Sequence, residues 1–301
     1  MIRLSEAVAD ALADGRPVVA LESTVFSSLG LPAPHNQTAL HQCLEAVASH
    51  GAVPAVTAVI DGVARVGIDA ADHERILGAT AKTASRELGV AVAQGWDVGV
   101  TTVSASLALA EAAGVAVFAT GGIGGVHRGA ELTGDVSADL AALARHRVVC
   151  VSAGAKAFLD LGRTLEMLDT LGVPVLGWRT EEFPAFYLRT SGLPVSRRID
   201  SAEEAAAALR ASIGFGLPQG VLVTPPIPEA DALDADRVWA VVEAAQRDAD
   251  ASGLRGAPVT PFVLERIAAA TEGESIPANL ALARHNAEVA AQIAVAWTAL
   301  A

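Results

Sequence analysis

Lysine is nearly absent from this 301-residue chain: Lys82 and Lys156 are the only two, and every other basic residue is arginine. Positive charge is scarce altogether, since 21 Lys and Arg stand against 34 Asp and Glu, a formal net charge of -13. The longest basic cluster is Arg197–Arg198. Because nucleic acids and anionic membrane surfaces require a basic footprint, this balance argues against both as partners and suits an enzyme of small molecules.

Cysteine is equally rare. Cys43 and Cys150 lie far apart in the sequence, which indicates two reduced thiols in a protein core rather than a disulfide framework. No apolar run reaches membrane-spanning length without an interrupting Gly, Asp or Glu. The first segment, MIRLSEAVADALADG, is amphipathic and acidic and has no apolar signal core. We therefore expect a cytoplasmic protein without a membrane span.

Aromatic residues make up only 4% of the chain, while 52% of it is hydrophobic. Alanine, valine, leucine and glycine supply the bulk of a well-filled core. Predicted strands at 17–24, 115–120, 147–154, 173–178 and 220–226 alternate with predicted helices, among them a continuous helical pattern over 70–94. Such alternation is typical of a parallel sheet covered on both faces. We expect a single domain over 1–301: a three-layer α/β/α sandwich with a mostly parallel central sheet and a helical C-terminal segment.

Polar or glycine-rich residues follow four of these strands. They are Glu22–Ser23–Thr24, Thr120–Gly121–Gly122, Ser152–Ala153–Gly154–Ala155–Lys156 and Thr224–Pro225–Pro226. In open parallel sheets, ligands bind at the carboxyl ends of the strands. The four ends are therefore expected to converge on one crevice.

Lys156 follows a strand and begins a predicted helix over 155–172. One interpretation is an ordinary solvated lysine. The arginine bias favours another, because arginine replaces lysine as a surface charge but not as an amine nucleophile. A desolvated lysine adds to a carbonyl and forms a Schiff base, and a nearby second cation favours its neutral form. Lys82 is a candidate for that cation or for a phosphate ligand.

Glu22, at a buried strand end, is either a hydrogen-bonded structural group or a general acid/base, since burial keeps a carboxyl protonated. The loop TGGIGGVHRGAE (120–131) fits neither the dinucleotide-binding pattern nor the P-loop. Its glycines allow close approach of the backbone to a ligand or a positive φ. His127 and Arg128 are candidates for anion contact, or form a solvated pair.

The segment GDVSADL (134–140) places Asp135 and Asp139 on either side of a helix start, with Ser137 as its N-cap. Asp135 is either a capping residue or a ligand of Mg²⁺ or Mn²⁺, which take one or two carboxylates and complete their shells with water. Zinc-ligand spacing and a hydrolase triad are both missing. The residues alone thus indicate a lysine-dependent enzyme acting on a carbonyl or masked aldehyde, and a phosphosugar fits.

Together these motifs resemble the pseudouridine-5'-phosphate glycosidase family, also known as the indigoidine-synthase-A-like proteins. The resemblance is collinear and nearly full length. It rests on VALEST (19–24), GLPAPHN (30–36), AVPAV (52–56), GVTTVSASL (99–107), FATGGIGGVHRGAE (118–131), DVSADL (135–140), SAGAKAFLDLGRTLE (152–166), FPAFY (183–187), GVLVTPPIP (220–228), VTPFVL (259–264) and ANLALARHNA (278–287).

The resemblance implies a lyase (pseudouridylate synthase) with glycosidase activity. It would reversibly cleave the C–C glycosidic bond of pseudouridine 5'-phosphate to uracil and ribose 5-phosphate, in pseudouridine and nucleotide catabolism. It also implies a homotrimer of α/β/α subunits with one Mn²⁺ per subunit. By the same resemblance, Lys156 forms the imine with ribose C1', Glu22 is the acid/base and Asp135 holds the metal. The implied substrate contacts are Lys82, Val103, Ser137, Ala138, Asp139, His127 and Asn279.

The chain departs from the family pattern around Lys82, where it reads KTASREL, and after Glu22, where it reads LGLPAP. Three other interpretations remain open. They are a different Schiff-base phosphosugar enzyme such as an aldolase, a non-catalytic protein that binds sugar phosphates, and a role in a pigment pathway.

Overall fold

The computed structural model describes residues 2–253, 259–271 and 273–300, and its strands join in one mixed sheet. The order across the sheet is β1-β4-β3-β2-β7-β8-β11-β9-β10, with β6 beside β3 and β5 beside β6. The strands are β1 (Ile2–Leu4), β2 (Val18–Leu21), β3 (Val53–Ile60), β4 (Val63–Val66), β5 (Lys82–Thr83), β6 (Val98–Thr101), β7 (Val117–Ala119), β8 (Val149–Val151), β9 (Val175–Trp178), β10 (Arg197–Ile199) and β11 (Val221–Thr224).

One half of the sheet is entirely parallel. Strands β2, β7, β8, β11, β9 and β10 pair in this sense, and all of β2, β7, β8 and β11 is buried. These strands read as short apolar runs because both of their faces are covered. In the registers, Leu21 lies opposite Ala119, Ala119 opposite Val151, and Val151 opposite Val223. The carboxyl ends of the four strands are therefore level, as the sequence predicted.

The other half is here called the antiparallel lobe, after the pairings of its long strand β3, and it also contains the parallel pairs β1–β4 and β5–β6. Residues 53–56 of β3 pair in parallel with β2, while residues 57–60 pair with β4 and residues 58–60 with β6, both antiparallel. The β3–β4 turn is formed by Asp61 and Gly62, a dipeptide that predicts a tight hairpin from the sequence alone, and the two residues have φ values of 52° and 67°. Positive φ at both central residues is the geometry that favours Asp-Gly in tight hairpins.

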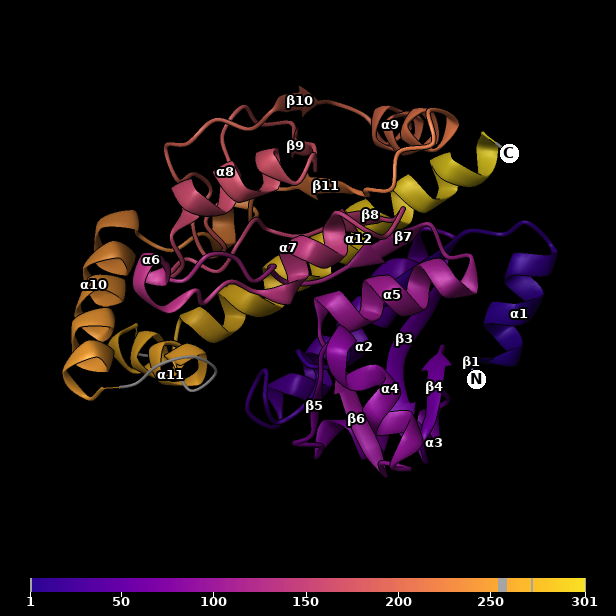
Figure 1. Cartoon of the computed structure of the whole chain (residues 1–301), viewed down its shortest axis with the longest axis horizontal. Coiled ribbons are helices and arrows are strands. Elements are labelled where there is room, and N and C mark those ends of the chain that lie inside the picture. The colour runs from indigo at the N-terminus through magenta and orange to yellow at the C-terminus, as the bar shows by residue number, and fades with distance from the viewer. Residues whose placement is uncertain (1, 254–258, 272, 301) are drawn as a thin grey trace.

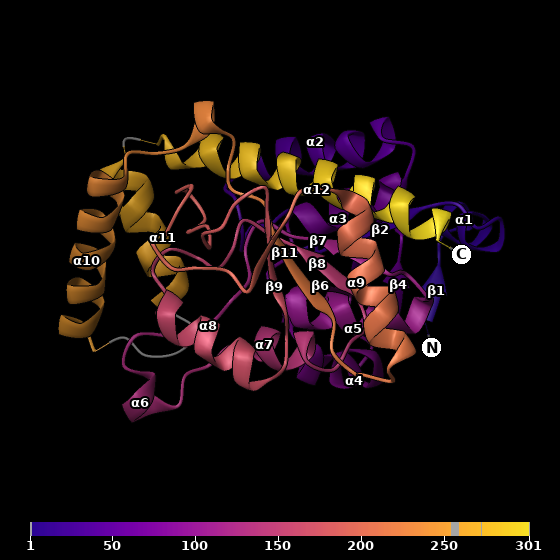
Figure 2. The same ribbon diagram turned by 90° about the horizontal axis from the view of Figure 1, so that it is seen from above.

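The helices complete the predicted three layers. They are α1 (Glu6–Ala13), α2 (His35–Ser49), α3 (Ala70–Leu77), α4 (Ser85–Ala93), α5 (Val103–Ala113), α6 (Ala130–Thr133), α7 (Ala138–Leu143), α8 (Leu161–Thr170), α9 (Ala202–Gly214), the 3₁₀ turn η1 (Glu229–Asp231), α10 (Ala235–Ala251), α11 (Val259–Ala270) and α12 (Ser275–Ala299). The long α12 runs across the molecule beside α2 on one face, and α5 and α7 lie on the opposite face (Figures 1 and 2).

Two predicted helices are wrong in their bounds. The pattern over 70–94 is two helices, α3 and α4, with strand β5 between them, so Lys82 lies on a strand. The helix predicted over 155–172 begins only at Leu161, behind the N-cap Asp160, so Lys156 lies in a loop. The short strands β1 and β10 were not predicted. For β1, β5 and β10 the deciding contact is a pairing with another strand, which local periodicity does not reveal.

Both cysteines are buried free thiols, as expected. Burial raises the pKa of Cys43 to about 12, so its sulfur stays protonated.

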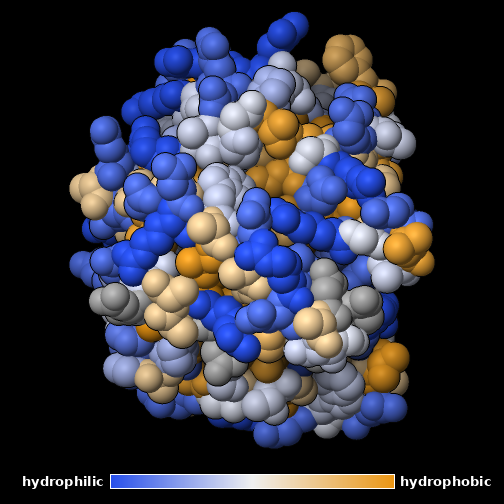
Figure 3. Space-filling model, turned by 90° about the vertical axis from the view of Figure 1, so that its left-hand side faces the viewer, coloured by the Kyte–Doolittle hydropathy of each residue, from blue (hydrophilic) through white to orange (hydrophobic). Residues whose placement is uncertain are grey.

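In the described part of the chain, every helix is too short or too polar to cross a membrane. The end of the molecule that carries α6 and α10 shows apolar residues scattered among hydrophilic ones (Figure 3). That residues 1–301 form a single domain stays a prediction.

Candidate active site

Glu22 directly follows β2 and stands at the level carboxyl edge of the parallel strands. The residue is partly accessible, and its carboxyl group is surrounded by protein. The hydroxyl of Thr120, which directly follows β7, donates a hydrogen bond of 2.7 Å to Oε1 of Glu22. Burial raises the pKa of Glu22 to about 7, against the opposing effects of that hydrogen bond and of the positive charges of Lys156 and Lys82. This carboxyl can therefore both donate and accept a proton near neutral pH.

A buried network of hydroxyls fixes the backbone around Glu22. Ser23 Oγ accepts a hydrogen bond of 2.8 Å from the backbone N–H of Thr101, the last residue of β6. Thr101 Oγ1 in turn lies 2.8 Å from Thr57 Oγ1 and 3.1 Å from Ser106 Oγ on α5. All four side chains belong to fully buried residues. The network joins β2, β3, β6 and α5 where the parallel and antiparallel parts of the sheet meet, so Glu22 and the start of α5 are held in a fixed relation.

Lys156 lies in the loop between β8 and α8. Its backbone N–H donates to the carbonyl of Ile123, at 3.2 Å, and the residue is half-buried. Gly154, two residues earlier, has a φ of 74°, and a Cβ there would collide with the carbonyl oxygen of Pro184. The loop that carries Lys156 is therefore confined between the glycine-rich loop and the FPAFY segment. The positive charge of Lys156 acts on Glu22, on Lys82 and on His127, because it influences the pKa of all three.

Lys82 approaches the same charge cluster from the antiparallel lobe. It lies opposite Val100 in the parallel β5–β6 pair, and the next residue lies opposite Thr101. Its side chain is accessible at the rim of the site. Burial of its amine and the neighbouring charge of Lys156 lower the pKa of Lys82. The two lysines are 74 positions apart in the sequence. Even so, they are close enough in the fold for the charge of Lys156 to lower the pKa of Lys82.

Asp139 is buried, and the backbone already uses both of its carboxylate oxygens. Oδ1 accepts a 3.0 Å hydrogen bond from the N–H of Ser104 in the first turn of α5, and Oδ2 accepts one of 2.9 Å from the N–H of Gly124. Ser137 is the N-cap of α7, as predicted, and accepts from the N–H of Asp139. Asp139 therefore connects the glycine-rich loop to the N-terminus of α5. Val103 is the first residue of that helix, and it is buried. Ala138, beside it, is exposed.

His127 and Asp135 face each other across the narrow neck of the 127–135 loop. Nδ1 of His127 lies 3.9 Å from Oδ2 of Asp135, and the N–H of His127 donates to the carbonyl of Asp135 at 3.0 Å. Burial lowers the pKa of His127, Asp135 opposes this, and the charges of Lys156 and Lys82 add to it. The ring sits against Phe158, with centroids 6.3 Å apart.

A manganese ion at Asp135 is compatible with this geometry only if most of its ligands come from outside the protein. Within residues 2–253, 259–271 and 273–300, no group of three or more His, Cys, Asp or Glu side chains is placed to share an ion. Asp135 would supply one carboxylate, and water or substrate would complete the shell, which is a common arrangement for hard divalent ions.

Asn279 lies on α12 and faces the glycine-rich loop. Its Oδ1 is buried and has no hydrogen-bond partner in the described part of the chain. A Cβ placed on Gly121 would lie 3.7 Å from that oxygen. Two turns further along α12, Asn286 faces the same loop, because its Nδ2 donates to the carbonyls of Thr120 and Gly121. Thr120 was expected only as one of the strand-end residues at the crevice, with no role of its own, and Asn286 was not predicted at all. The seven-residue spacing of the two asparagines nevertheless places them on one helix face.

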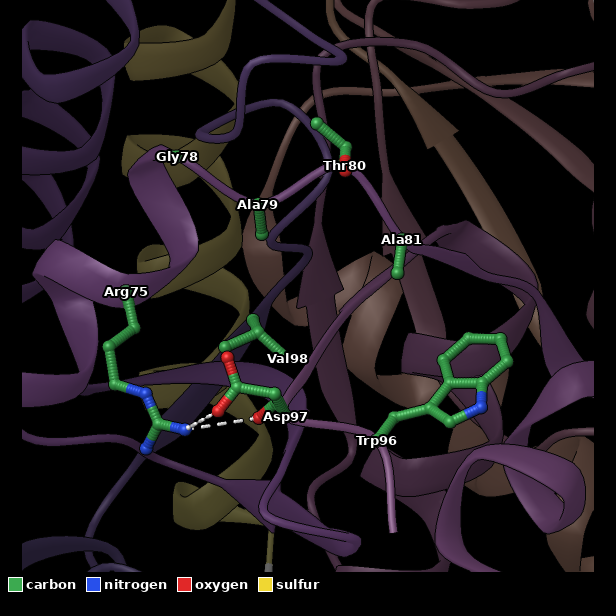
Figure 4. Close-up of a pocket in the computed structure, with 8 residues that line it drawn as sticks. All are labelled: Arg75, Gly78, Ala79, Thr80, Ala81, Trp96, Asp97 and Val98. Atoms are coloured by element: carbon green, nitrogen blue, oxygen red, sulfur yellow. Dashed lines mark hydrogen bonds and ion pairs between the residues drawn. The ribbon is translucent and has the colours of Figure 1, made fainter. Parts of the chain in front are cut away.

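A separate cavity of about 670 Å³ lies on the antiparallel lobe, lined by residues 75, 78–81 and 96–98. Figure 4 shows Arg75 pointing toward Asp97, with Trp96 across from it. The guanidinium is already paired, at 2.7 Å from a carboxylate oxygen of Asp97 and 2.7 Å from one of Asp61. The cavity contains none of the predicted site residues. The candidate site is thus defined by its cluster of charged groups at the sheet edge.

Known proteins match this chain over nearly its full length. The sequence profile of the indigoidine synthase A-like proteins matches residues 7–296. A pseudouridine-5'-phosphate glycosidase of Herpetosiphon aurantiacus is 52% identical over 295 residues, which cover 97% of each chain. The protein of the same name from Caldanaerobacter subterraneus is 50% identical over 297 residues, covering 98% of this chain and 96% of its own.

Two solved structures share the fold in detail. The prealnumycin C-glycosynthase AlnA, in complex with ribulose 5-phosphate, superposes with a TM-score of 0.92 at 37% identity, over 100% of this chain and 98% of that one. An indigoidine synthase A-like protein from Thermotoga maritima superposes with a TM-score of 0.88 at 34% identity, over 99% of this chain and 97% of that one.

Proposed function

The chain belongs to the indigoidine synthase A-like family. We propose that it is a pseudouridine-5'-phosphate glycosidase, which is the name of its relatives at 52% and 50% identity. It reversibly cleaves the C–C glycosidic bond of pseudouridine 5'-phosphate to uracil and ribose 5-phosphate. The observation that carries the proposal is the charge cluster. Both lysines of the chain act on one carboxyl whose pKa is about 7, at the carboxyl edge of a parallel sheet.

The lysine is needed because a C–C glycoside has no oxygen or nitrogen leaving group at C1'. The pair of carboxylates that hydrolyses ordinary glycosides is therefore poorly suited to it. The amine of Lys156 bonds to C1' as the bond from C1' to the ring oxygen breaks, and the ring oxygen takes a proton. The new ammonium nitrogen loses a proton, which restores its lone pair. That lone pair then forms an iminium as the C1'–C5 bond breaks toward uracil, and C5 takes a proton.

Water completes the cycle by adding to the iminium and releasing ribose 5-phosphate from Lys156. Glu22 handles the protons at the ring oxygen and at C5. A carboxyl with a pKa near 7 exists in both protonation states at neutral pH, so it can give one proton and recover another. Lys82 places a second positive charge beside Glu22, and its own pKa is lowered by burial and by the charge of Lys156.

The remaining predicted residues surround this chemistry. Lys82 and the N-terminus of α5 supply the positive charge for the phosphate, and Val103 and the 137–139 segment contact the sugar phosphate beside them. His127 and Asn279 line the glycine-rich loop. Asp135 would hold one Mn²⁺ per subunit, and the ion would supply a positive charge that orders water and phosphate. A homotrimer in the cytoplasm completes the proposal. The mass in solution by light scattering, about three times the 30.6 kDa of the chain, tests the trimer.

Borohydride trapping tests the imine. Incubation with ribose 5-phosphate and borohydride reduces the imine to a stable secondary amine on Lys156. With only two lysines in the chain, a lysine-specific protease reports the site directly, since cleavage after Lys156 is blocked and cleavage after Lys82 continues. Lys156→Ala and Lys156→Arg abolish both the label and turnover. Label on Lys82, or undiminished turnover in Lys156→Ala, contradicts the mechanism.

Release of uracil from pseudouridine 5'-phosphate tests the function itself and separates it from the alternatives. A phosphosugar aldolase shares the lysine but releases no uracil, and a binding protein shows affinity without turnover and tolerates Lys156→Arg. The likeness to a C-glycosynthase at 37% identity makes C–C bond formation the second candidate. Running the assay from uracil and ribose 5-phosphate with other acceptors in competition distinguishes the two.

The same assay tests the metal. Chelation lowers turnover and added Mn²⁺ restores it, while Asp135→Asn weakens the response to Mn²⁺. Full activity after exhaustive chelation contradicts the role of the metal, and it leaves the proposed lysine chemistry unaffected.

A further inference from the structure

The carboxyl of Glu22 is held by Thr120, and Thr120 is held by Asn286. Thr120 directly follows β7, is 5% exposed, and donates from its hydroxyl to Oε1 of Glu22 at 2.7 Å. Among the described residues, the Glu22 carboxyl makes no other hydrogen bond to a side chain. The bond between Thr120 and Glu22 connects two neighbouring strands at their carboxyl ends, 98 positions apart in sequence.

Thr120 is itself held from the opposite layer by Asn286. This asparagine lies on α12, is fully buried, and donates from Nδ2 to the carbonyl oxygens of Thr120 at 2.7 Å and Gly121 at 3.1 Å. Its Oδ1 has no partner among residues 2–253, 259–271 and 273–300. The amide thus directs its hydrogen bonds to the two carbonyls that follow β7. Helix α12 contacts both β7 and β2, so the strands that carry Thr120 and Glu22 share this support.

We propose that Asn286 and Thr120 are positioning residues for Glu22. Asn286 fixes the backbone of Thr120, and the Thr120 hydroxyl holds the Glu22 carboxyl where it exchanges protons with the substrate. The inference rests on the proposed function for the identity of that substrate. The hydrogen bond itself has a consequence that can be measured without any substrate.

The consequence follows from which form of the carboxyl accepts the hydrogen bond better. A hydroxyl donor stabilises the ionised carboxylate more than the neutral acid. Three charged groups on other elements also act on Glu22: Lys156 from the β8–α8 loop, Lys82 from β5 and Asp139 from α7. A variant that removes only the Thr120 hydroxyl leaves these three in place, so the pKa of Glu22 rises above its value of about 7.

Thr120→Val removes the donor and keeps the shape of the side chain. The Glu22 carboxyl is titrated by infrared difference spectroscopy, with Glu22→Gln as the blank that identifies its signal. We expect the midpoint to move up by about 0.5–1 pH unit, the equivalent of one hydrogen bond of about 1 kcal/mol. Thr120→Ser keeps the hydroxyl and titrates like the wild type. Should Thr120→Val fail to fold, Thr120→Ala provides a second hydroxyl-free side chain.

A matched control and a double variant complete the test. Thr224, at the end of β11, is an equally buried threonine whose hydroxyl donates to the backbone carbonyl of Leu176. Thr224→Val is expected to leave the midpoint unchanged. Asn286→Leu is expected to raise it by a smaller amount, and Thr120→Val with Asn286→Leu to raise it no further than Thr120→Val alone, because both changes act on one hydrogen bond.

Uracil release measured on the same variants separates the two claims. We expect one limb of the pH–rate profile to follow the infrared midpoint, with kcat lowered more than KM is raised. If the wild type releases uracil and Thr120→Val titrates like the wild type, the positioning pair is wrong and the proposed function stands. If the midpoint moves and the wild type releases no uracil, the function is wrong and the pair stands. An Asn286→Leu shift that adds to that of Thr120→Val overturns the link between the two residues.

Discussion

At the scale of single residues, burial decides what Glu22 can do. The carboxyl sits among protein atoms with one hydroxyl donor and two lysine charges, and the cost of burying its charge exceeds what these partners recover. The resulting pKa is about 7. Burial of this carboxyl therefore lowers the stability of the fold at neutral pH, but it makes the carboxyl suited to proton transfer. Buried titratable groups with strongly shifted pKa values are often functional for this reason.

This burial has a measurable effect on stability. Because the pKa of Glu22 is raised from 4.5 to about 7 in the folded protein, the folded state keeps a proton that the unfolded chain loses as the pH passes through that window. The stabilisation by that proton is complete below pH 4.5 and lost by the time the pH has passed 7. Glu22→Gln removes this dependence. Its free energy of unfolding relative to wild type rises by about 3 kcal/mol between pH 4 and pH 8.

Denaturant unfolding at a series of pH values measures that difference. Glu166→Gln, a change at an exposed carboxyl on α8, serves as the control and keeps a constant offset from wild type. A constant offset for Glu22→Gln as well contradicts the raised pKa.

At the scale of elements, the site depends on a carboxylate that joins two backbone segments. Asp139 receives the N–H groups of Ser104 and Gly124 and so holds the N-terminus of α5 against the glycine-rich loop. A negative charge at a helix N-terminus is favourable in itself. The hydroxyl network around Thr101 fixes the other side of the same junction. The elements that carry Lys82, Val103 and Glu22 are therefore connected beneath the site rather than across its opening.

Asp139→Asn tests this connection. The amide keeps one acceptor oxygen and turns an NH₂ group toward a backbone donor, so one of the two hydrogen bonds is lost and the other is no longer charge-assisted. We expect the free energy of unfolding to fall by about 2–3 kcal/mol. Asp135→Asn, at a partly exposed carboxylate that lies 3.9 Å from the imidazole of His127, changes it by less than about 0.5 kcal/mol. Equal effects of the two changes in urea unfolding contradict the structural function of Asp139.

At the scale of the whole molecule, α12 connects regions that are far apart in the sequence. The helix contacts α2, α9, β2, β7 and β8, and along it Asn279 and Asn286 face the glycine-rich loop. The last helix of the chain therefore covers one face of the parallel sheet and supports the active-site loop at the same time (Figure 2).

Leu282→Ala measures this support. Leu282 is fully buried on α12, between the two asparagines, and a Cβ on Gly121 would lie 3.4 Å from it. Creating a cavity there lowers the free energy of unfolding by about 2–5 kcal/mol. Leu300→Ala removes the same atoms from a residue that is 39% exposed and is expected to cost far less. Thermal and denaturant unfolding of both variants compares them, and similar losses contradict a core function for this part of α12.

Much of this protein was determined by local patterns. Apolar runs that lead into Glu22, Thr120 and the loop of Lys156 predicted parallel strands with a shared carboxyl edge. They did so because a strand that is buried on both faces consists almost entirely of apolar residues. Asp61–Gly62 predicted its hairpin, because few residues adopt positive φ in succession. Ser137 predicted its own N-cap. The scarcity of lysine drew attention to Lys156 before any fold was known, since arginine cannot serve as an amine nucleophile.

Only the tertiary structure decided what surrounds those groups. Lys82 looked like a helical residue and lies on a strand, since its pairing with β6 is a contact between separate segments. Asp139 stays a predicted substrate contact, and the structure adds that both of its oxygens accept hydrogen bonds from distant backbone N–H groups. Thr120 and Asn286 carried no signal of their hydrogen bonds, which span 98 and 166 positions. Protonation and orientation depend on neighbours brought together by folding, and sequence order does not contain those distances.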